Sequence, residues 1–392
     1  MMHANRQIHT SMLFIVLALA AGPVVGSDVP HVHNGATPRD GIQKVVLEEL
    51  WRVGGDEDDV FFGRVPRVET DQQGNIYILD SQLCQVSVYS PAGDLLRTLF
   101  GQGEGPGEVL GPQDMFLMPD GSVGLVLEEL GKVKFVDASG DPAGSLRLDS
   151  MEGGHYALVS GAGTVNGVIL AGRRSTEGET RFIRDRRSFL IRSDLDGHET
   201  AVFAENHWTW DFSEFNYVES DQMPPFHWGF DVGIDGRIYA VVQRGSYAVS
   251  VFAPGGTLEL VIERDYAPLK RTTEGREQFS HLIKTSMEDM PFEMKVEQED
   301  TDPAISFLHR GLQVTSDGFL WVLSGRGMEP DEPEVMAIYD VFDRNGVFVR
   351  QVALVAPHEA DQVGIVFAGD SRVIVIKGFL ESLASQFGNG AS

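Results

Sequence analysis

The sequence predicts an all-β fold of six similar units arranged in a ring, and three observations support this prediction. A turn with Asp or Gly, followed by a short alternating β-branched run, recurs six times along the 392 residues. A second pair of alternating runs around a Gly-containing turn follows five of the six. The 44 glycines supply the positive backbone angles that many tight turns require. Four antiparallel strands per repeated unit are typical of the blades of a β-propeller.

Each unit begins with a hairpin whose turn carries Asp-Gly or a related pair, which is a strong signal for two antiparallel strands. The first hairpins are 71–80, 119–128, 164–173, 234–243, 316–325 and 369–378. A second hairpin then adds two outer strands to the blade. The second hairpins are 86–99, 133–146, 189–203, 249–262 and 337–352.

The two ends of the chain complete the predicted ring. The sixth unit has no clear second hairpin before Ser392, and the strand-compatible stretch 43–53 precedes the first unit without a partner. We expect this N-terminal strand to join the last blade and close the ring, because closure removes sheet edges that are prone to aggregation. The prediction is a single six-bladed domain over residues 42–392 with four-stranded antiparallel blades.

Two insertions interrupt the even spacing of the units. Within residues 268–302, apolar side chains recur at helical spacing, so we expect a short helical insertion between blades 4 and 5. Residues 206–230 are unusually rich in aromatic side chains. This second insertion has two interpretations: its aromatic rings pack together as a small core beside the ring, or they form the wall of a ligand cleft at the channel mouth.

Residues 1–26 have the pattern of a signal peptide. A positive residue is followed by an apolar run at 12–21 and by small residues suited to cleavage. We expect residues 27–41 to form a flexible segment, and no other stretch is apolar and long enough to span a membrane. The only cysteine, Cys84, is not placed for lipid attachment. The sequence therefore predicts an exported protein, periplasmic or extracellular, that is not a lipoprotein.

The formal net charge of −27 disfavours some classes of partner. An acidic surface repels phosphate backbones, so we expect no nucleic-acid partner, and anionic membrane surfaces are disfavoured for the same reason. Solubility is the simplest consequence of this charge. We expect a soluble monomer.

The first unit carries a specific repeat pattern. It reads Asp-Gln-Gln-Gly-Asn-Ile-Tyr-Ile-Leu-Asp at 71–80 and Val-Ser-Val-Tyr at 86–89, and a glycine-rich linker at 101–108 precedes Pro112. In this pattern the chain resembles the NHL-type repeat and the bacterial six-bladed β-propeller proteins related to it. The resemblance implies a central channel with binding loops on one face. It does not imply a chemistry, since propellers host many functions.

The predicted binding residues stand at the starts of the inner strands, where they would face the channel. The sequence contains no motif of a zinc protease or of a serine hydrolase. Our leading hypothesis is an exported, non-enzymatic binding module that offers a protein, peptide or glycan partner a face built from loops and the two insertions. The candidate ligand-binding residues are Arg67, Gln113, His155, His227, Trp228, His309 and Arg310.

The alternative hypothesis is a metal-assisted hydrolase or lyase acting at the channel mouth. Among the six-bladed relatives, lactonases hold a central Ca²⁺ with carboxylate and amide side chains, and amidating lyases use a metal bound by histidines. The comparable positions here do not form a carboxylate cage, but His155, His227 and His309 stand at equivalent blade starts and could converge on the axis. Under this alternative the resemblance implies Ca²⁺ or Zn²⁺. Under the leading hypothesis we expect no cofactor.

Two further patterns contain metal-binding side chains. Residues 56–59 are four acidic residues in a row, but a charge run of this kind is typical of a solvated loop. His31 and His33 could ligate a metal. Their position close to the predicted mature N-terminus favours a flexible tail instead.

Overall fold

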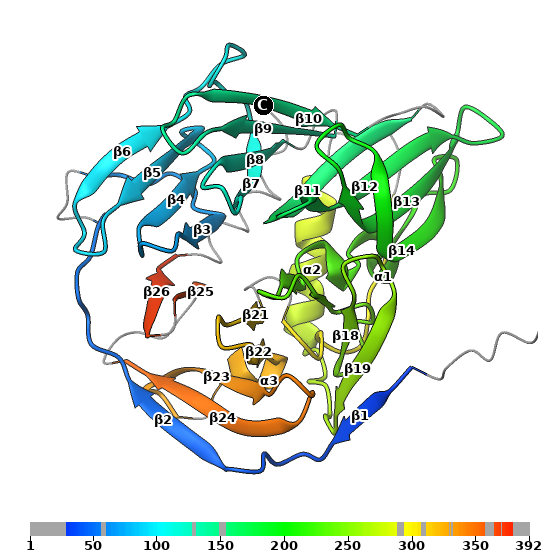
Figure 1. Ribbon diagram of the computed structural model, residues 1–392. Coiled ribbons are helices and arrows are strands. Elements are labelled where there is room, and N and C mark those ends of the chain that lie inside the picture. Colours follow the sequence, from blue (N-terminus) through cyan, green and yellow to red (C-terminus); the bar gives the residue numbers. More distant parts are fainter. Residues whose placement is uncertain are drawn as a thin grey trace, which may run out of the picture.

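The chain forms an all-β propeller in which the sheets stand side by side around a common centre, as the computed structural model shows (Figure 1). Each large sheet is one blade, and its strands follow one another from the centre to the rim. The structure describes residues 29–55, 60–127, 131–148, 154–287, 294–306, 311–328, 330, 332–356, 364–369 and 371–378.

Blades 1, 2 and 3 each consist of four antiparallel strands in chain order. Blade 1 contains β3 (Arg67–Thr70), β4 (Ile76–Asp80), β5 (Gln85–Tyr89) and β6 (Leu95–Leu99). Blade 2 contains β7 (Pro112–Leu117), β8 (Val123–Leu127), β9 (Lys132–Val136) and β10 (Pro142–Arg147). Blade 3 contains β11 (His155–Thr164), β12 (Gly167–Glu177), β13 (Ile183–Ser193) and β14 (Glu199–Asp211).

Blades 4 and 5 each carry a fifth strand on the outer edge. Blade 4 contains β16 (Phe230–Val232), β17 (Ile238–Ala240), β18 (Ala248–Phe252), β19 (Leu258–Arg264) and β1 (His31–Asn34). Blade 5 contains β21 (Leu312–Val314), β22 (Leu320–Leu323), β23 (Val335–Phe342), β24 (Phe348–Val355) and β2 (Ile42–Val46).

Several hairpins form where the sequence predicts them because an Asp side chain fixes the turn. In the first, Asp71 Oδ1 accepts hydrogen bonds from Gln73 N (2.9 Å) and Asn75 N (2.8 Å). Gly74 follows with φ of 79°, a conformation that a residue with a Cβ adopts only under strain. The same pattern of bonds recurs at Asp137 and Asp343.

The prediction of six four-stranded blades is wrong. Five sheets have four or five strands, and in the described part of the chain the sixth unit supplies only β25 (Gly364–Ala368) and β26 (Arg372–Ile376). This short sheet lies between blades 5 and 1 (Figure 1). Ile365 packs into the core of blade 5, and Val366 packs against Val68 of blade 1. Two strands therefore occupy the position at which the sequence predicted a complete blade.

The prediction that the N-terminal strand joins the last unit is also wrong. β2 pairs in parallel with β24 of blade 5, and β1, which lies in the segment 27–41 predicted to be flexible, pairs in parallel with β19 of blade 4. Asn34 connects the two blades, because its Nδ2 donates to Gly346 O (2.9 Å) and its Oδ1 accepts from Phe348 N (2.8 Å). The N-terminal segment thus covers the exposed edges of two neighbouring blades.

Polar side chains on the inner strands fasten each blade to the next. In each case a carboxylate or amide oxygen accepts a hydrogen bond from a backbone N–H of the neighbouring inner strand. Three such bonds are Gly161 N to Asp114 (3.0 Å), Val314 N to Asp231 (2.7 Å) and Phe367 N to Gln313 (2.8 Å). Apolar clusters fill the space between blades, as Leu79 and Met115 do between blades 1 and 2.

In its described residues, the insertion 268–302 contains one helix, α2 (Thr273–Ser286). Thr272 caps it, since its Oγ1 accepts a hydrogen bond from Gly275 N (3.0 Å). The remaining helical elements are single turns, namely α1 (Glu219–Gln222), η1 (Pro225–His227) and α3 (Gly325–Met328). Among the described residues, no helix is long and apolar enough to cross a membrane.

Candidate functional site

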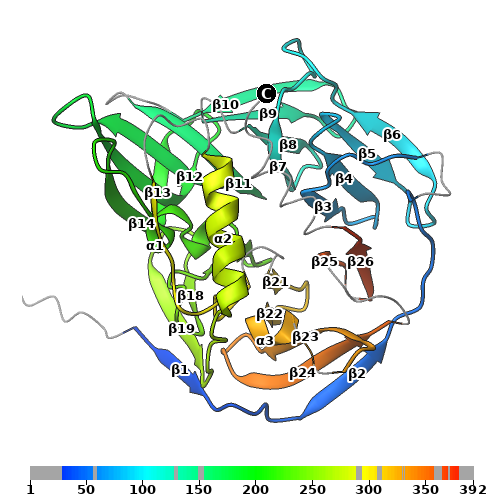
Figure 2. The ribbon, with the colours of Figure 1, turned by 180° about the vertical axis from the view of Figure 1, so that it is seen from behind.

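One face of the propeller carries both insertions and the tip of a long hairpin. Each insertion connects the outer strand of one blade to the inner strand of the next, so both lie on the face where inner strands begin. Since neighbouring strands of a blade are antiparallel, the turn between β12 and β13 lies on this face too. The strands of blade 3 have 10 to 13 residues and extend beyond those of other blades. In Figure 2, α2 lies in front of the ring on this face.

The two insertions pack against each other and form a small core of their own. β15 (Asn216–Val218) pairs in parallel with β20 (Lys295–Glu297). Phe215 and Tyr217 are buried against Ile283 of α2, and other aromatic and apolar side chains surround them. Trp210, Phe212, Phe279, Met287, Met294 and Val296 complete this cluster. Of the two interpretations of the aromatic insertion, the small core therefore describes Phe215 and Tyr217.

A buried ion-pair cluster locks the insertions to blade 4. Glu219, only 1% exposed, accepts two hydrogen bonds from Arg271 (2.8 and 2.9 Å) and one from Glu299 N (3.0 Å). Arg244 Nη2 lies 2.6 Å from the same carboxylate. Arg271 also reaches Asp302 with its Nε (3.1 Å). A carboxylate buried so completely is stable only when its charge and its lone pairs are satisfied, as they are here.

The face of blade 3 that is turned toward the insertions is basic and aromatic. Arg173 of β12, Arg184 and Arg186 of β13, and Trp208 and Trp210 of β14 project from this face, because β13 pairs with β12 and β14 in a register that aligns them. We call these five residues the arginine wall. The guanidinium of Arg186 lies over the Trp210 ring, 3.6 Å from its centroid.

Among the described residues, no carboxylate forms an ion pair with Arg186. Burial, together with the positive charges of Arg173 and Arg184, lowers its pKa to about 10. Its Nε is buried and has no hydrogen-bond partner among the described residues. The burial of the charged guanidinium costs free energy, and the attraction to the quadrupole of the Trp210 ring offsets part of that cost. Positive charge is thus concentrated at one place on a strongly acidic protein.

Arg187, the next residue along β13, has the opposite environment. It projects from the other face of blade 3 and forms ion pairs with Glu199 (2.9 Å) and Glu205 (2.9 Å). These carboxylates outweigh the effect of burial, so the pKa of Arg187 is raised. On this other face of blade 3, acidic side chains therefore neutralise the charge of the arginine.

Gln222 orients the two indoles of the arginine wall. It is 5% exposed, and with its amide oxygen turned toward the rings it accepts hydrogen bonds from Trp208 Nε1 (3.1 Å) and Trp210 Nε1. The rings of both tryptophans are therefore fixed by the insertion rather than free to rotate.

His227 is fully buried beside the arginine wall. Its Nε2 donates to Gly172 O (3.1 Å), and Ser160 Oγ donates to its backbone carbonyl. Burial lowers the pKa of His227 well below the ordinary value, and the charge of Arg173 acts in the same direction. The imidazole is thus neutral and fastens the second insertion to the inner strands of blade 3.

Arg67 lies among acidic side chains of the inner strands. Its Nε is 2.7 Å from Glu69 and 3.5 Å from Asp114. Burial alone would lower the pKa of Arg67, but Asp114 and Glu69, with a smaller contribution from Asp231 of blade 4, raise it above the usual value. Arg67 therefore balances the carboxylates of three blades.

The structure does not bring the other predicted site residues together. Among the described residues, Gln113 forms one long bond, to Gly111 O (3.4 Å), and His155 is exposed at the start of β11. Trp228 is half-buried with its ring edge-on to His227. His309 and Arg310 lie outside the described residues, as does the acidic run 56–59. The trio His155, His227 and His309 accordingly stays a prediction.

The arginine wall was not predicted, although the sequence contains a signal for it. Two arginine doublets, 173–174 and 186–187, stand on adjacent strands of a chain with few basic residues. Because successive side chains of a strand point to opposite faces, one member of each doublet must face the insertions. The register that aligns Arg186 with Trp208 is not visible in the sequence.

Comparisons with known proteins assign no family to this chain. No family model matches the chain, and no curated protein matches it. Among solved structures, similar chains are an exported-protein candidate from Bacteroides fragilis (TM-score 0.39, 11% identity, covering 80% of each chain), a gluconolactonase from Xanthomonas campestris (0.37, 11%, 80% of this chain and 84% of that one) and virginiamycin B lyase from Staphylococcus aureus (0.36, 12%, 76% and 72%). Similarity at this level does not assign a substrate to this chain.

Proposed function

We propose that the protein is an exported β-propeller binding module whose ligand, a peptide or a glycan, places an anionic group against the arginine wall. The ligand would bind the face of the propeller that carries both insertions. The starts of the inner strands would form the bottom of this binding surface. Trp208 and Trp210 would contact the body of the ligand, because aromatic faces suit sugars and extended peptides.

The observation that carries the proposal is that Arg186 has no carboxylate partner in the part of the chain that the structure describes. An arginine that is partly buried beside two other arginines costs stability unless an anion approaches it. A carboxylate, sulfate or phosphate group supplies the missing charge and matches the planar fork of a guanidinium. The paired Arg187 shows that the fold could have provided such a carboxylate itself.

The surrounding structure favours binding with little rearrangement. Glu219 holds both insertions to blade 4, and Gln222 fixes the indoles. A binding surface that is ordered before the ligand arrives loses less conformational entropy on association. The net charge of −27 repels anions elsewhere, so an anionic ligand would be directed to this one basic face.

Titration with charged and uncharged ligands tests the proposal. We expect a sulfated oligosaccharide or a glutamate-rich peptide to bind, and its uncharged counterpart to bind at least tenfold more weakly, since a charge-assisted hydrogen bond contributes about 1.5–3 kcal/mol. Arg186→Met should cause a similar loss, whereas Arg187→Met, on the opposite face, should leave the affinity unchanged. Equal losses in both variants, or equal binding of both ligands, would refute the proposal.

The metal-assisted enzyme stays the alternative. Arg67 already balances Glu69 and Asp114, so a cation held by these carboxylates would have to displace the guanidinium. The prediction from the histidines is tested by metal analysis of the wild-type protein and of the variant with His155, His227 and His309 changed to Ala. Stoichiometric Ca²⁺ or Zn²⁺ that disappears in this variant would favour the enzyme.

A further inference from the structure

We propose that His31, His33 and Glu263 form a binding site for a divalent transition metal, such as Zn²⁺, on the rim of blade 4. This site is separate from the arginine wall and does not depend on the function proposed for that face.

Strand geometry brings the three side chains together. His31 and His33 are two residues apart on β1, so both project to the same side of the strand. In the parallel pairing with β19, His33 lies opposite Glu263. The strand pairing therefore places two imidazoles and one carboxylate on one surface.

The donor atoms of the three residues converge. His31 Nδ1 is 3.1 Å from Glu263 Oε1, and His33 Nδ1 is 2.6 Å from Glu263 Oε2. The ligand atoms of the trio all lie within 4.8 Å of one another, and the two rings are stacked. In a tetrahedral zinc site with bonds near 2.0–2.1 Å, the ligand atoms are about 3.3 Å apart. Small side-chain rotations would open the cluster to this spacing.

The donor set selects the class of metal. Two imidazoles and a carboxylate are the ligands of many zinc sites that keep a further position open. Hard ions such as Ca²⁺ and Mg²⁺ prefer oxygen donors alone, so a site with two nitrogens disfavours them. Side-chain exposures of 47% for His31, 75% for His33 and 28% for Glu263 leave the site open to ions in solution.

The strand that carries the histidines is anchored directly after His33. Asn34 donates to Glu263 O (3.0 Å) and is also bound to the turn of blade 5 described above. The two histidines thus belong to a paired strand, contrary to the expectation of a flexible tail. Ligands held by strand pairing need less ordering when the metal binds.

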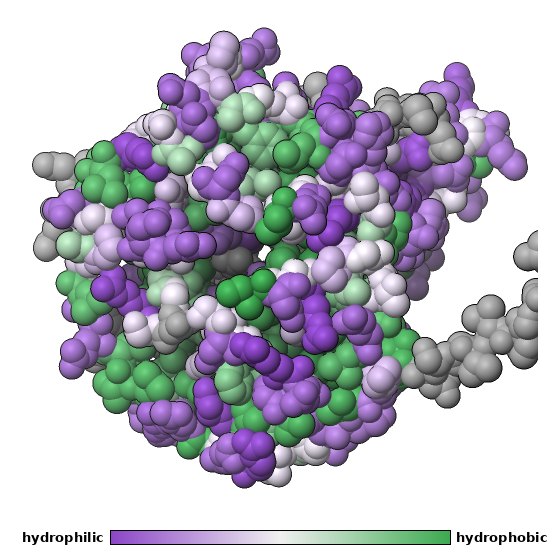
Figure 3. Space-filling view, in the orientation of Figure 1, coloured by the Kyte–Doolittle hydropathy of each residue, from purple (hydrophilic) through white to green (hydrophobic). Residues whose placement is uncertain are grey.

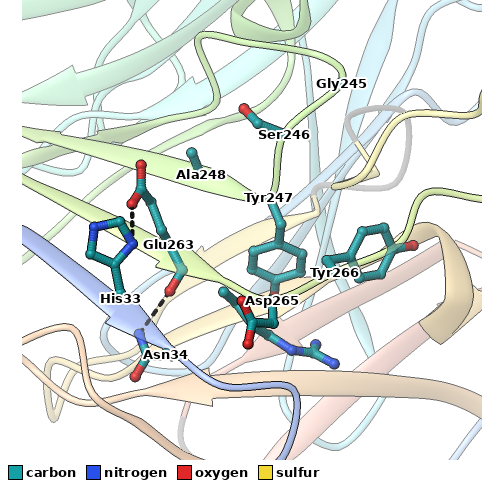
Figure 4. A pocket seen from close by; sticks show the side chains of 10 residues that line it. His33, Asn34, Gly245, Ser246, Tyr247, Ala248, Glu263, Asp265 and Tyr266 are labelled. Atoms are coloured by element: carbon teal, nitrogen blue, oxygen red, sulfur yellow. Dashed lines mark hydrogen bonds and ion pairs between the residues drawn. The ribbon is translucent and has the colours of Figure 1, made fainter.

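The site opens onto a pocket. His33 and Glu263 line a depression of about 380 Å³ together with Ser246, Tyr247, Asp265 and others (Figure 4). In Figure 4 the ring of His33 is turned toward the Glu263 carboxylate at the edge of this pocket. A metal bound there would stand at the pocket rim, with its free coordination position accessible to water or to a small ligand.

A second group of metal-binding side chains provides the control. Asp194, Asp196 and His198 also lie within 4.8 Å of one another, on the turn between β13 and β14. However, Asp194 Oδ1 accepts hydrogen bonds from Asp196 N (3.0 Å) and His198 N (2.9 Å), so this carboxylate already serves the turn.

The test is zinc titration of the purified full chain, expressed without a histidine tag and freed of metal. We expect one Zn²⁺ per chain. His33→Ala and Glu263→Gln should each weaken binding by about tenfold or more, because each removes a direct ligand, and His198→Gln should leave it unchanged.

A melting measurement separates loss of the site from loss of the fold. Zn²⁺ should raise the melting temperature of the wild type but not of His33→Ala, and without metal the two should melt alike. If His33→Ala melts early, His31→Gln serves as the second ligand variant. The proposal is wrong if no Zn²⁺ binds, or if Zn²⁺ binds the ligand variants as tightly as the wild type.

Discussion

Glu219→Gln is the sharpest test of how the binding face is held together. The substitution keeps the size of the side chain and removes its charge, and it leaves Arg244 and Arg271, each 10% exposed, without their shared counter-ion. Breaking a buried ion pair in this way costs about 3–5 kcal/mol. An unfolding entropy of about 2.1 cal/mol/K per residue makes 1 kcal/mol equal to about 1.2 °C for a 392-residue chain. The expected fall in melting temperature is therefore about 4–6 °C.

Calorimetry or thermal circular dichroism measures this shift, and Glu214→Gln is the matched control. Glu214 is an exposed acidic residue of the same insertion, so its amide variant should melt within about 1 °C of the wild type. The Glu219 variant should also bind the anionic ligand more weakly, because the insertion that carries Gln222 is no longer fixed. A melting temperature equal to that of the control would show that the ion-pair cluster does not stabilise this face.

Three other substitutions test separate parts of the structure. Arg186→Met should raise the unfolding free energy by up to about 1 kcal/mol although it weakens ligand binding, whereas Arg187→Met should lower the unfolding free energy by about 0.5–2 kcal/mol. Urea unfolding that ranks the two variants the other way would contradict the electrostatic argument. Near pH 6.5, His227 takes up a proton in the unfolded chain but not in the folded protein. Its contribution to stability is therefore present above that pH. The contribution is lost as the pH falls toward the lower pKa of the folded state, by up to about 1.4 kcal/mol per pH unit. In His227→Gln this part of the slope between pH 6.5 and 5 should vanish, and an unchanged slope would refute the assignment. Asp340→Asn removes the buried partner of Arg264 between blades 4 and 5, so a loss of about 3–5 kcal/mol is expected in the same urea measurement, and a loss below about 1 kcal/mol would contradict it.

The hairpins of the blades were predictable because their signals are local in the sequence. The pairing of strands far apart in the chain was not predictable. Asp71 and Gly74 fix a turn by contacts within five residues, so the sequence reveals each hairpin directly. The destination of the N-terminal strand depends on which sheet edge is free. β24 and β19 offer such edges, and nothing in the residues 42–46 distinguishes them from the edge of the sixth unit.

The candidate site was predictable only in its location. The sequence indicated that the two insertions shape one face, and it drew attention to His227. It could not show that Glu219 meets Arg244 and Arg271, since ion-pair partners that far apart in the chain leave no pattern. Among the candidate residues at the starts of the inner strands, Arg67 forms an ion pair with Glu69.

Figure 3 shows the face of the ring opposite the insertions, where hydrophilic and hydrophobic residues are interspersed around a hollow over the centre.

The most direct measurement is anomalous diffraction from crystals soaked in selenate, an anion whose position the selenium signal reveals. A strong peak within hydrogen-bonding distance of Arg186 and close to the Trp210 ring is the predicted result. Peaks confined to other arginines, with none at the arginine wall, would contradict the claim that this wall receives the anionic group of the ligand.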